Sequence, residues 1–78
     1  MLTPAQCRAA RGLIDRSQSD LAQHASVGVV TIRQLEAGVY ASRRATLYVV
    51  RRAFESAGVE FIDENGGGAG VRLRRSEG

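Results

Sequence analysis

Two short helices with almost no linker between them are predicted in the middle of the chain, and this feature most constrains the fold. Ser17 begins the pattern Ser-x-x-Asp, which caps a helix that ends near Ser26. A second helix is predicted from about 28 or 29 to 36, and Gly38 stands just past it, where glycine is typical of a helix end. Two short helices separated by three or four residues form a helix-turn-helix.

A further helix is predicted on each side of this pair. Thr3-Pro4-Ala5-Gln6 is a capping box with proline at the first helical position, so a helix begins there and runs to about Ile14. Its apolar face consists of Cys7, Ala10, Leu13 and Ile14. After a linker over residues 39–42, apolar side chains recur at helical spacing up to Gly58 and predict a fourth helix. They are Leu47, Val50, Ala53, Phe54 and Ala57.

The last part of the chain has a different period. Val59-Glu60-Phe61-Ile62 and Val71-Arg72-Leu73-Arg74 alternate as β-strands do, with a turn-rich stretch over residues 63–70 between them. The expected fold is mainly α, with a helix-turn-helix domain over residues 1–58 and a short C-terminal β-hairpin and tail over residues 59–78. Because an isolated hairpin is marginally stable in water, it must pack against the helices or against a second subunit.

Composition limits the classes of protein to which the chain can belong. At 78 residues it forms one small domain, whose limited core favours an oligomer. No apolar run approaches the roughly 20 residues that span a bilayer, so we expect a soluble, cytoplasmic protein without a membrane partner. Cys7 and His24 are the only residues of their types, which argues against a disulfide or an ordinary zinc site. We expect His24 at the surface and no metal or cofactor.

Charge favours a polyanionic partner. All eleven basic residues are arginine, and the net charge is +3. Residues 1–58 hold eight arginines against four acidic residues, a net charge of +4, whereas residues 59–78 hold three against four, a net charge of −1. A basic helical region is what an interface with nucleic acid requires, although a charge of this size is weak evidence by itself. No set of nucleophile, base and orienting residue is visible, so we do not expect an enzyme.

The second helix of the pair has two chemically different faces. At about 100° per residue, Ile32 and Leu35 lie together on the core side, with Thr31 beside them. The other side presents Val29, Val30, Arg33 and Gln34.

We interpret this outer side as a surface that reads DNA. Gln34 can pair with adenine, Arg33 with guanine or a phosphate, and a valine methyl can pack on the methyl group of thymine. In the alternative interpretation, Val30 is an ordinary exposed apolar residue and Val29 is tucked under a neighbouring loop.

Residues 17–38, S-Q-S-D-L-A-Q-H-A-S-V-G-V-V-T-I-R-Q-L-E-A-G, resemble the helix-turn-helix of the lambda-repressor/Cro family, also called the XRE family. The pattern S-Q-x-x-L-A, a valine at the turn, and T-I-x-x-L-E-x-G carry the resemblance, which extends over residues 3–58. It implies a four-helix, lambda-repressor-like domain. The sequence departs from the family pattern at three places: Ser26 replaces the usual turn glycine, Gly28 replaces a capping serine or threonine, and two valines replace a polar pair.

The resemblance also implies roles for individual residues. DNA base contacts would come from Val29, Val30, Arg33 and Gln34. DNA phosphate contacts would come from Gln18, Thr31, Arg43 and Arg44, and for each of these two arginines taken alone, ordinary surface solvation is nearly as good an interpretation. Arg11 would form a structural ion pair with Glu36.

These observations predict a sequence-specific transcriptional regulator, more specifically a repressor. It would bind double-stranded operator DNA as a homodimer, with its recognition helices about 34 Å apart on an inverted repeat. Phe54, Phe61 and Leu73 are the candidate dimer contacts, and they can equally well complete the core of the monomer. The alternative function is an antitoxin or antiactivator that keeps the fold and binds another protein through the valines or the hairpin.

Overall fold

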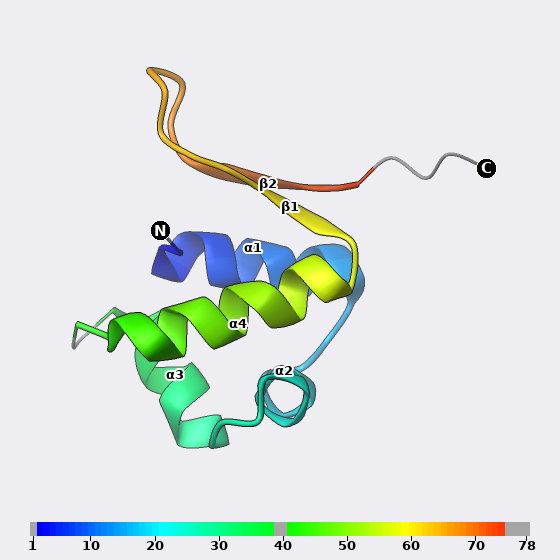
Figure 1. Ribbon diagram of the computed structural model, residues 1–78, viewed down its shortest axis with the longest axis vertical. Helices are drawn as coiled ribbons and strands as arrows, with labels where there is room; N and C mark the ends of the chain where they lie inside the picture. The colour runs from blue at the N-terminus through cyan, green and yellow to red at the C-terminus, as the bar shows by residue number, and fades with distance from the viewer. Residues whose placement is uncertain (1, 39–40, 75–78) are drawn as a thin grey trace.

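The computed structural model describes residues 2–38 and 41–74. Within them the chain forms four helices and a two-stranded antiparallel hairpin (Figure 1). They are α1 (Pro4–Ile14), α2 (Gln18–Ala25), α3 (Val29–Ala37), α4 (Arg44–Ser56), β1 (Val59–Ile62) and β2 (Gly70–Leu73). The predicted mainly helical fold with a C-terminal hairpin is confirmed. Residues 39–40 of the predicted linker and 75–78 of the predicted tail lie outside the described residues.

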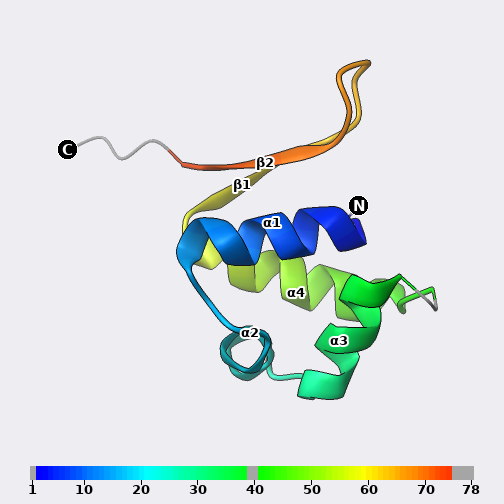
Figure 2. The same ribbon diagram turned by 180° about the vertical axis from the view of Figure 1, so that it is seen from behind.

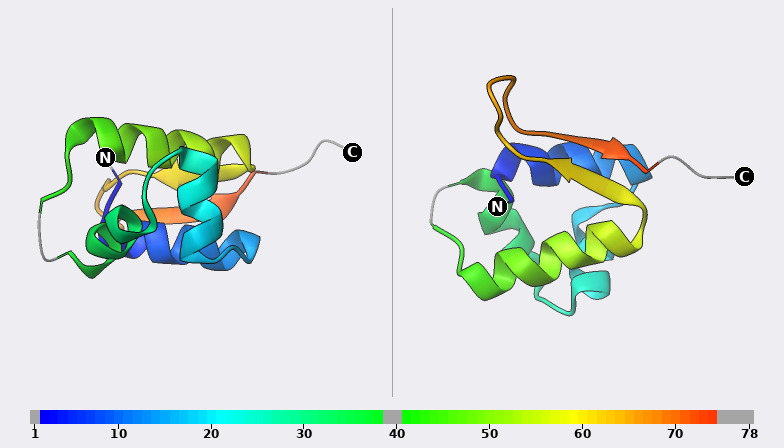
Figure 3. Two further views of the ribbon diagram at one scale, coloured as in Figure 1. Left: turned by 90° about the horizontal axis from the view of Figure 1, so that it is seen from below. Right: turned by 45° about the horizontal axis from the view of Figure 1, so that its top comes forward.

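The elements surround a single core. Helices α1 and α4 lie on opposite sides of the core, and the hairpin crosses over both (Figure 3). Helices α2 and α3 close the side opposite the hairpin, as Figures 1 and 2 show. The buried apolar side chains are Leu2, Cys7, Ala10, Leu21, Ala22, Ala25, Ile32, Leu35, Val50, Phe54 and Val59. None of the helices in the described part of the chain is long and apolar enough to cross a membrane.

Local side-chain signals set the ends of the helices. At the start of α1, the Thr3 hydroxyl accepts the backbone N–H of Gln6 at 3.1 Å, and the Gln6 side chain accepts the Thr3 N–H at 2.9 Å. Ser17 and Asp20 form the same reciprocal capping box at the start of α2. Helix α3 ends at Gly38, whose φ of +67° is the left-handed conformation that glycine adopts without strain.

The turn between α2 and α3 contains two of the departures from the family pattern. Ser26 ends α2 with a φ of +58°, a left-handed conformation that costs a residue with a side chain roughly 1–2 kcal/mol. Gly28 begins α3 without a side-chain cap, and its φ of −72° is open to any residue. The turn therefore carries a serine where glycine would be unstrained and a glycine where serine would form a cap.

The structure corrects two details of the predicted elements. Leu13, expected on the buried face of α1, is exposed, and Gln6 takes a buried position instead. The Gln6 side-chain amide donates to the carbonyl oxygens of Ile62 at 3.4 Å and Gly70 at 3.0 Å, so α1 is tied to both strands of the hairpin. Strand β2 begins at Gly70 and ends at Leu73, one residue earlier at each end than predicted.

The hairpin packs on the helices of its own chain. Its register pairs Val59 with Leu73, Glu60 with Arg72, Phe61 with Val71 and Ile62 with Gly70. The Phe61 ring contacts that of Phe54 edge to face, with 5.9 Å between the ring centres, and the Arg51 guanidinium lies 4.9 Å from the Phe61 ring centre. Phe54 is completely buried within its own chain, so of the two interpretations it completes the core of the monomer and offers no surface to a second subunit. Leu73 is 53% exposed.

Candidate nucleic-acid interface

Helix α3 has an inner side in the core and an outer side that is exposed. Ile32 and Leu35 are buried in the core. On the opposite side Val30, Arg33 and Gln34 are exposed, and we call these three residues the reader face. Val30 is 55% exposed, although it is apolar. Val29, expected in the same patch, is only partly exposed because it packs against the core.

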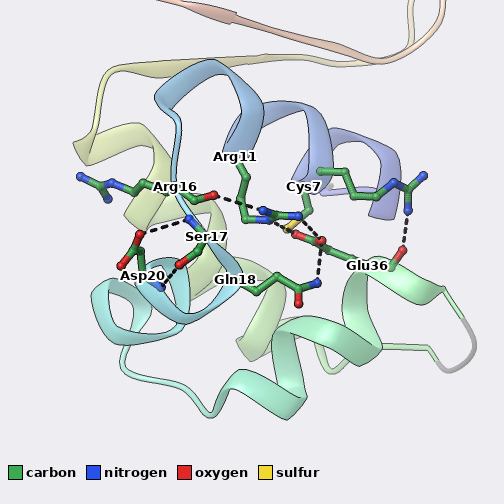
Figure 4. Close-up of polar contacts among 8 residues, drawn as sticks. Cys7, Arg11, Arg16, Ser17, Gln18, Asp20 and Glu36 are labelled. Atoms are coloured by element: carbon green, nitrogen blue, oxygen red, sulfur yellow. Dashed lines mark hydrogen bonds and ion pairs between the residues drawn. The ribbon is translucent and has the colours of Figure 1, made fainter.

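The last turn of α3 is tied to α1 and α2 through the buried carboxylate of Glu36 (Figure 4). Arg11 donates to both carboxylate oxygens, from Nε to Oε2 at 2.6 Å and from Nη2 to Oε1 at 2.8 Å. Gln18 Nε2 donates to Oε1 at 3.0 Å, and the Cys7 thiol donates to Oε2 at 3.2 Å. We call these four residues the Glu36 cluster. The guanidinium of Arg8 also donates to the Glu36 backbone carbonyl.

The hydrogen bonds within the Glu36 cluster stabilise the ionised form of the Glu36 carboxyl group. Burial alone would raise the pKa of Glu36, but hydrogen bonds from Arg11, Gln18 and Cys7 outweigh it and hold this pKa below its ordinary value. The same hydrogen bond raises the pKa of Arg11. Burial and the hydrogen bond to Glu36 raise the pKa of the Cys7 thiol, which keeps its proton and acts as a donor.

Two members of this cluster are not predicted from the sequence. The helical pattern predicts Cys7 only as a small core residue, and the family resemblance implies only a contact with a DNA phosphate for Gln18. The spacing of Cys7 and Arg11 was an available signal, because residues four apart lie on the same face of a helix. The structure brings Arg11 and Glu36 together as an ion pair, and Gln18, the first residue of α2, also donates to Glu36.

A polar hollow of about 320 Å³ lies beside the reader face, between α3 and the start of α4. It is lined by Thr31, Gln34, Ala41, Ser42, Arg43 and Thr46. Helix α4 begins without a side-chain cap, so its first N–H groups add positive partial charge near this place. Hydroxyl and guanidinium donors around such a hollow suit the oxygens of a phosphate.

Three arginines around this region are available to an external anion. Arg33, Arg43 and Arg44 are exposed, and no other residue within 2–38 and 41–74 forms a hydrogen bond or ion pair with their side chains. Arg43 lines the hollow beside α3, whereas Arg44 lines a different one on the outer side of α4. The two arginines therefore point to different surfaces.

Comparison of the sequence with models of protein families and with curated proteins finds no match in either. Within the described ranges, no group of three or more His, Cys, Asp or Glu side chains could hold a metal ion. His24 lies exposed on α2.

Proposed function

We propose that this protein is a sequence-specific DNA-binding transcriptional regulator, more specifically a repressor, that binds an inverted-repeat operator as a homodimer. The orientation of α3 carries this proposal. Val30, Arg33 and Gln34 are exposed together, while Ile32 and Leu35 of the same helix form part of the core. A short helix that projects such a face from a helix-turn-helix has the shape and the chemistry to enter the major groove.

Each residue of the reader face suits a different base. The Gln34 amide can form two hydrogen bonds with adenine, and Arg33 can form two with guanine. The exposed methyl groups of Val30 suit the methyl group of thymine. Val29 is a weaker candidate for a base contact because part of its side chain is used in the core.

The Glu36 cluster supports this function by fixing the end of the reading helix. Arg11 and Gln18 hold Glu36 from two other helices, and these contacts would fix the orientation of α3 before DNA binds. Such preorganisation lowers the entropic cost of binding.

Phosphate contacts would come from the edge of the same surface. Thr31 and Arg43 line the polar hollow, and Gln18 stands at the start of α2 with its amide nitrogen already held by Glu36. Arg44 is a weaker candidate, because it lines the hollow on the outer side of α4. Thr31, Arg43 and Gln18 would set the position of the protein on the duplex, and the reader face would set the sequence.

Selection from random duplex DNA by the purified protein tests this function. We expect an enriched palindrome whose half-sites are one helical turn apart. Arg33→Ala and Gln34→Ala should each weaken binding to it by about 1–3 kcal/mol and relax the preference at one position per half-site. Glu64→Ala, at the exposed hairpin tip, is the control and should bind normally.

A protein-binding role as an antitoxin or antiactivator is the second candidate, and the exposed, apolar Val30 favours it. The same selection separates the two roles. If no sequence is enriched, or if Arg33→Ala and Gln34→Ala leave regulation in cells intact, the DNA-binding role is wrong.

A further inference from the structure

The outer side of α4 is exposed although it carries large side chains. Val50 and Phe54 are buried on the inner side, whereas Tyr48 is 65% exposed and Val49 is 37% exposed. Arg44, Tyr48, Arg52 and Glu55 follow one another along the outer side at helical spacing. No other element of the described chain lies over this side of α4, which forms an edge of the molecule in Figure 3. We call it the α4 outer face.

The α4 outer face is shaped as a ridge between two hollows. One hollow, of about 540 Å³, lies on the side of Leu2 and Leu47. The other, of about 360 Å³, lies on the side of His24 and Ala25 of α2. Tyr48 and Arg52 line both, so they form the ridge. Helices associate by placing the ridge of one into the groove of another, and this surface offers both parts.

The charges at the two ends of α4 are opposite to those that its own dipole favours. Two arginines stand at its start, Arg43 as the N-cap and Arg44 as the first helical residue, and Glu55 lies in the last turn. Among the described residues, the Glu55 carboxylate is paired only along the helix, 3.3 Å from Arg51 and 4.0 Å from Arg52. A second helix of the same sequence, packed antiparallel, would place a negative end beside each positive start.

We propose that two copies of this chain associate through their α4 outer faces, with the two α4 helices antiparallel across a twofold axis that passes between Tyr48 and Arg52. Arg44 of each copy then faces Glu55 of the other. Tyr48 of each copy lies beside Arg52 of the other, where the guanidinium can stack on the ring. Both pairings are reciprocal, as a twofold interface requires.

This dimer would supply the pair of subunits that the proposed binding to an inverted repeat requires. Its biological meaning therefore rests on the proposed function. In the left view of Figure 3, α2 and α3 face the viewer while α4 forms one edge. An axis beyond that edge and parallel to the line of sight leaves both α3 helices on the same side of the dimer. Two reader faces on one side are what an inverted repeat requires.

Sedimentation equilibrium without DNA, on the full chain, tests the interface. We expect a dimer for the wild type and a dissociation constant at least about tenfold higher for Arg44→Glu and for Glu55→Arg, because each variant sets like charges opposite each other twice. An equimolar mixture of the two variants restores both opposite pairs in the heterodimer, so we expect the mixture to dimerise about as tightly as the wild type. Circular dichroism verifies that each variant is folded.

Two controls separate this surface from the hairpin. Glu64→Arg makes the same charge change as Glu55→Arg at the exposed tip, and Leu73→Glu places a charge on the exposed end of β2. Both should dimerise normally. A monomeric wild type, single variants that still dimerise, a mixture that stays monomeric, or a dimer that Leu73→Glu dissociates would each overturn the α4 interface.

The outcome is independent of the outcome for DNA binding. If the charge variants behave as expected but no duplex is selected, the interface stands and the regulator is wrong. If a palindrome is selected but the charge variants still dimerise, the regulator stands and the two subunits pair through another surface.

Discussion

A single buried carboxylate, that of Glu36, joins three helices. Its oxygens accept hydrogen bonds from Cys7, Arg11 and Gln18, so every member of the cluster is a partner of the same side chain. A buried charge is tolerated only where such partners replace its hydration. No buried side-chain nitrogen or oxygen in the described residues lacks a partner. Glu36 therefore acts on the orientation of the reader face through α3, without being exposed itself.

Glu36→Gln should lower the free energy of unfolding by about 2–3 kcal/mol, because it leaves the Arg11 guanidinium without its counter-charge in a partly buried place. Urea unfolding followed by circular dichroism measures the change. Glu60→Gln is the matched control: it breaks a 2.8 Å ion pair with Arg72 on the exposed side of the hairpin and should cost less than about 1 kcal/mol. Equal losses in the two variants would show that burial does not strengthen the Glu36 pair.

The stability of the wild type should fall in acid, and Glu36 should account for part of that fall. Because its pKa is lower in the folded state, its contribution is complete above the ordinary carboxyl pKa and is lost as the pH falls through the lowered value. Unfolding measured from neutral to acidic pH should give a shallower slope for Glu36→Gln than for the wild type. Asp20, whose pKa is lowered by hydrogen bonds from Ser17, keeps some dependence in the variant. Parallel curves would contradict this role.

At the scale of elements, the turn between α2 and α3 contains two features that lower the stability of the fold. Ser26 adopts a left-handed conformation, and α3 begins without a side-chain cap. The two helices keep their places because Leu21, Ile32 and Leu35 pack in one core. The hairpin is held differently: buried Gln6 bonds to a carbonyl of each strand, and the rings of Phe54 and Phe61 meet beneath it.

Gly28→Ser should raise the free energy of unfolding by about 0.5 kcal/mol, because serine can accept the free N–H groups at the start of α3 and also stiffens the unfolded chain. The backbone allows this change: φ is −72°, and an added Cβ would meet only the Thr31 hydroxyl, at 3.9 Å. Gly28→Ala is the control and should gain less, because it stiffens the unfolded chain but offers no capping oxygen. Thermal unfolding compares the two. An equal gain for both variants would assign the effect to the unfolded chain alone.

At the scale of the whole molecule, a small body of 35 × 29 × 19 Å carries two separate exposed surfaces. The reader face belongs to α3, and the α4 outer face is next to it along the chain. Arg43 and Arg44 stand between them and line different hollows. A change in this short segment therefore acts on either surface according to which arginine is replaced.

The affinity for the selected operator should fall steeply with salt concentration, because binding releases cations from the phosphates. Arg43→Gln should weaken binding to all duplexes similarly and reduce the slope of log K against log salt by about one for each subunit. Fluorescence anisotropy at several salt concentrations measures this slope. Arg72→Gln, on the far side of the molecule, should leave it unchanged. A slope near zero in the wild type would contradict phosphate binding and favour a protein partner.

The sequence alone was sufficient for the elements and for the orientation of α3. Capping boxes at Thr3 and Ser17 and the glycine at position 38 are signals within three or four residues, so they mark helix ends without knowledge of the rest of the fold. The orientation of α3 followed from the period of Ile32 and Leu35. These features depend on backbone geometry that each segment already contains.

Only the tertiary structure decided which distant residues meet. Cys7 and Gln18 reach Glu36 across gaps of 29 and 18 residues, and Gln6 reaches the hairpin across more than 50. The burial of Phe54 and the exposure of Leu13 also belong to this level. The sequence pattern around a residue is the same whether or not other elements of the fold bury its side chain. Its burial depends on how the helices and the hairpin pack together, and a periodic pattern within one segment does not contain that information.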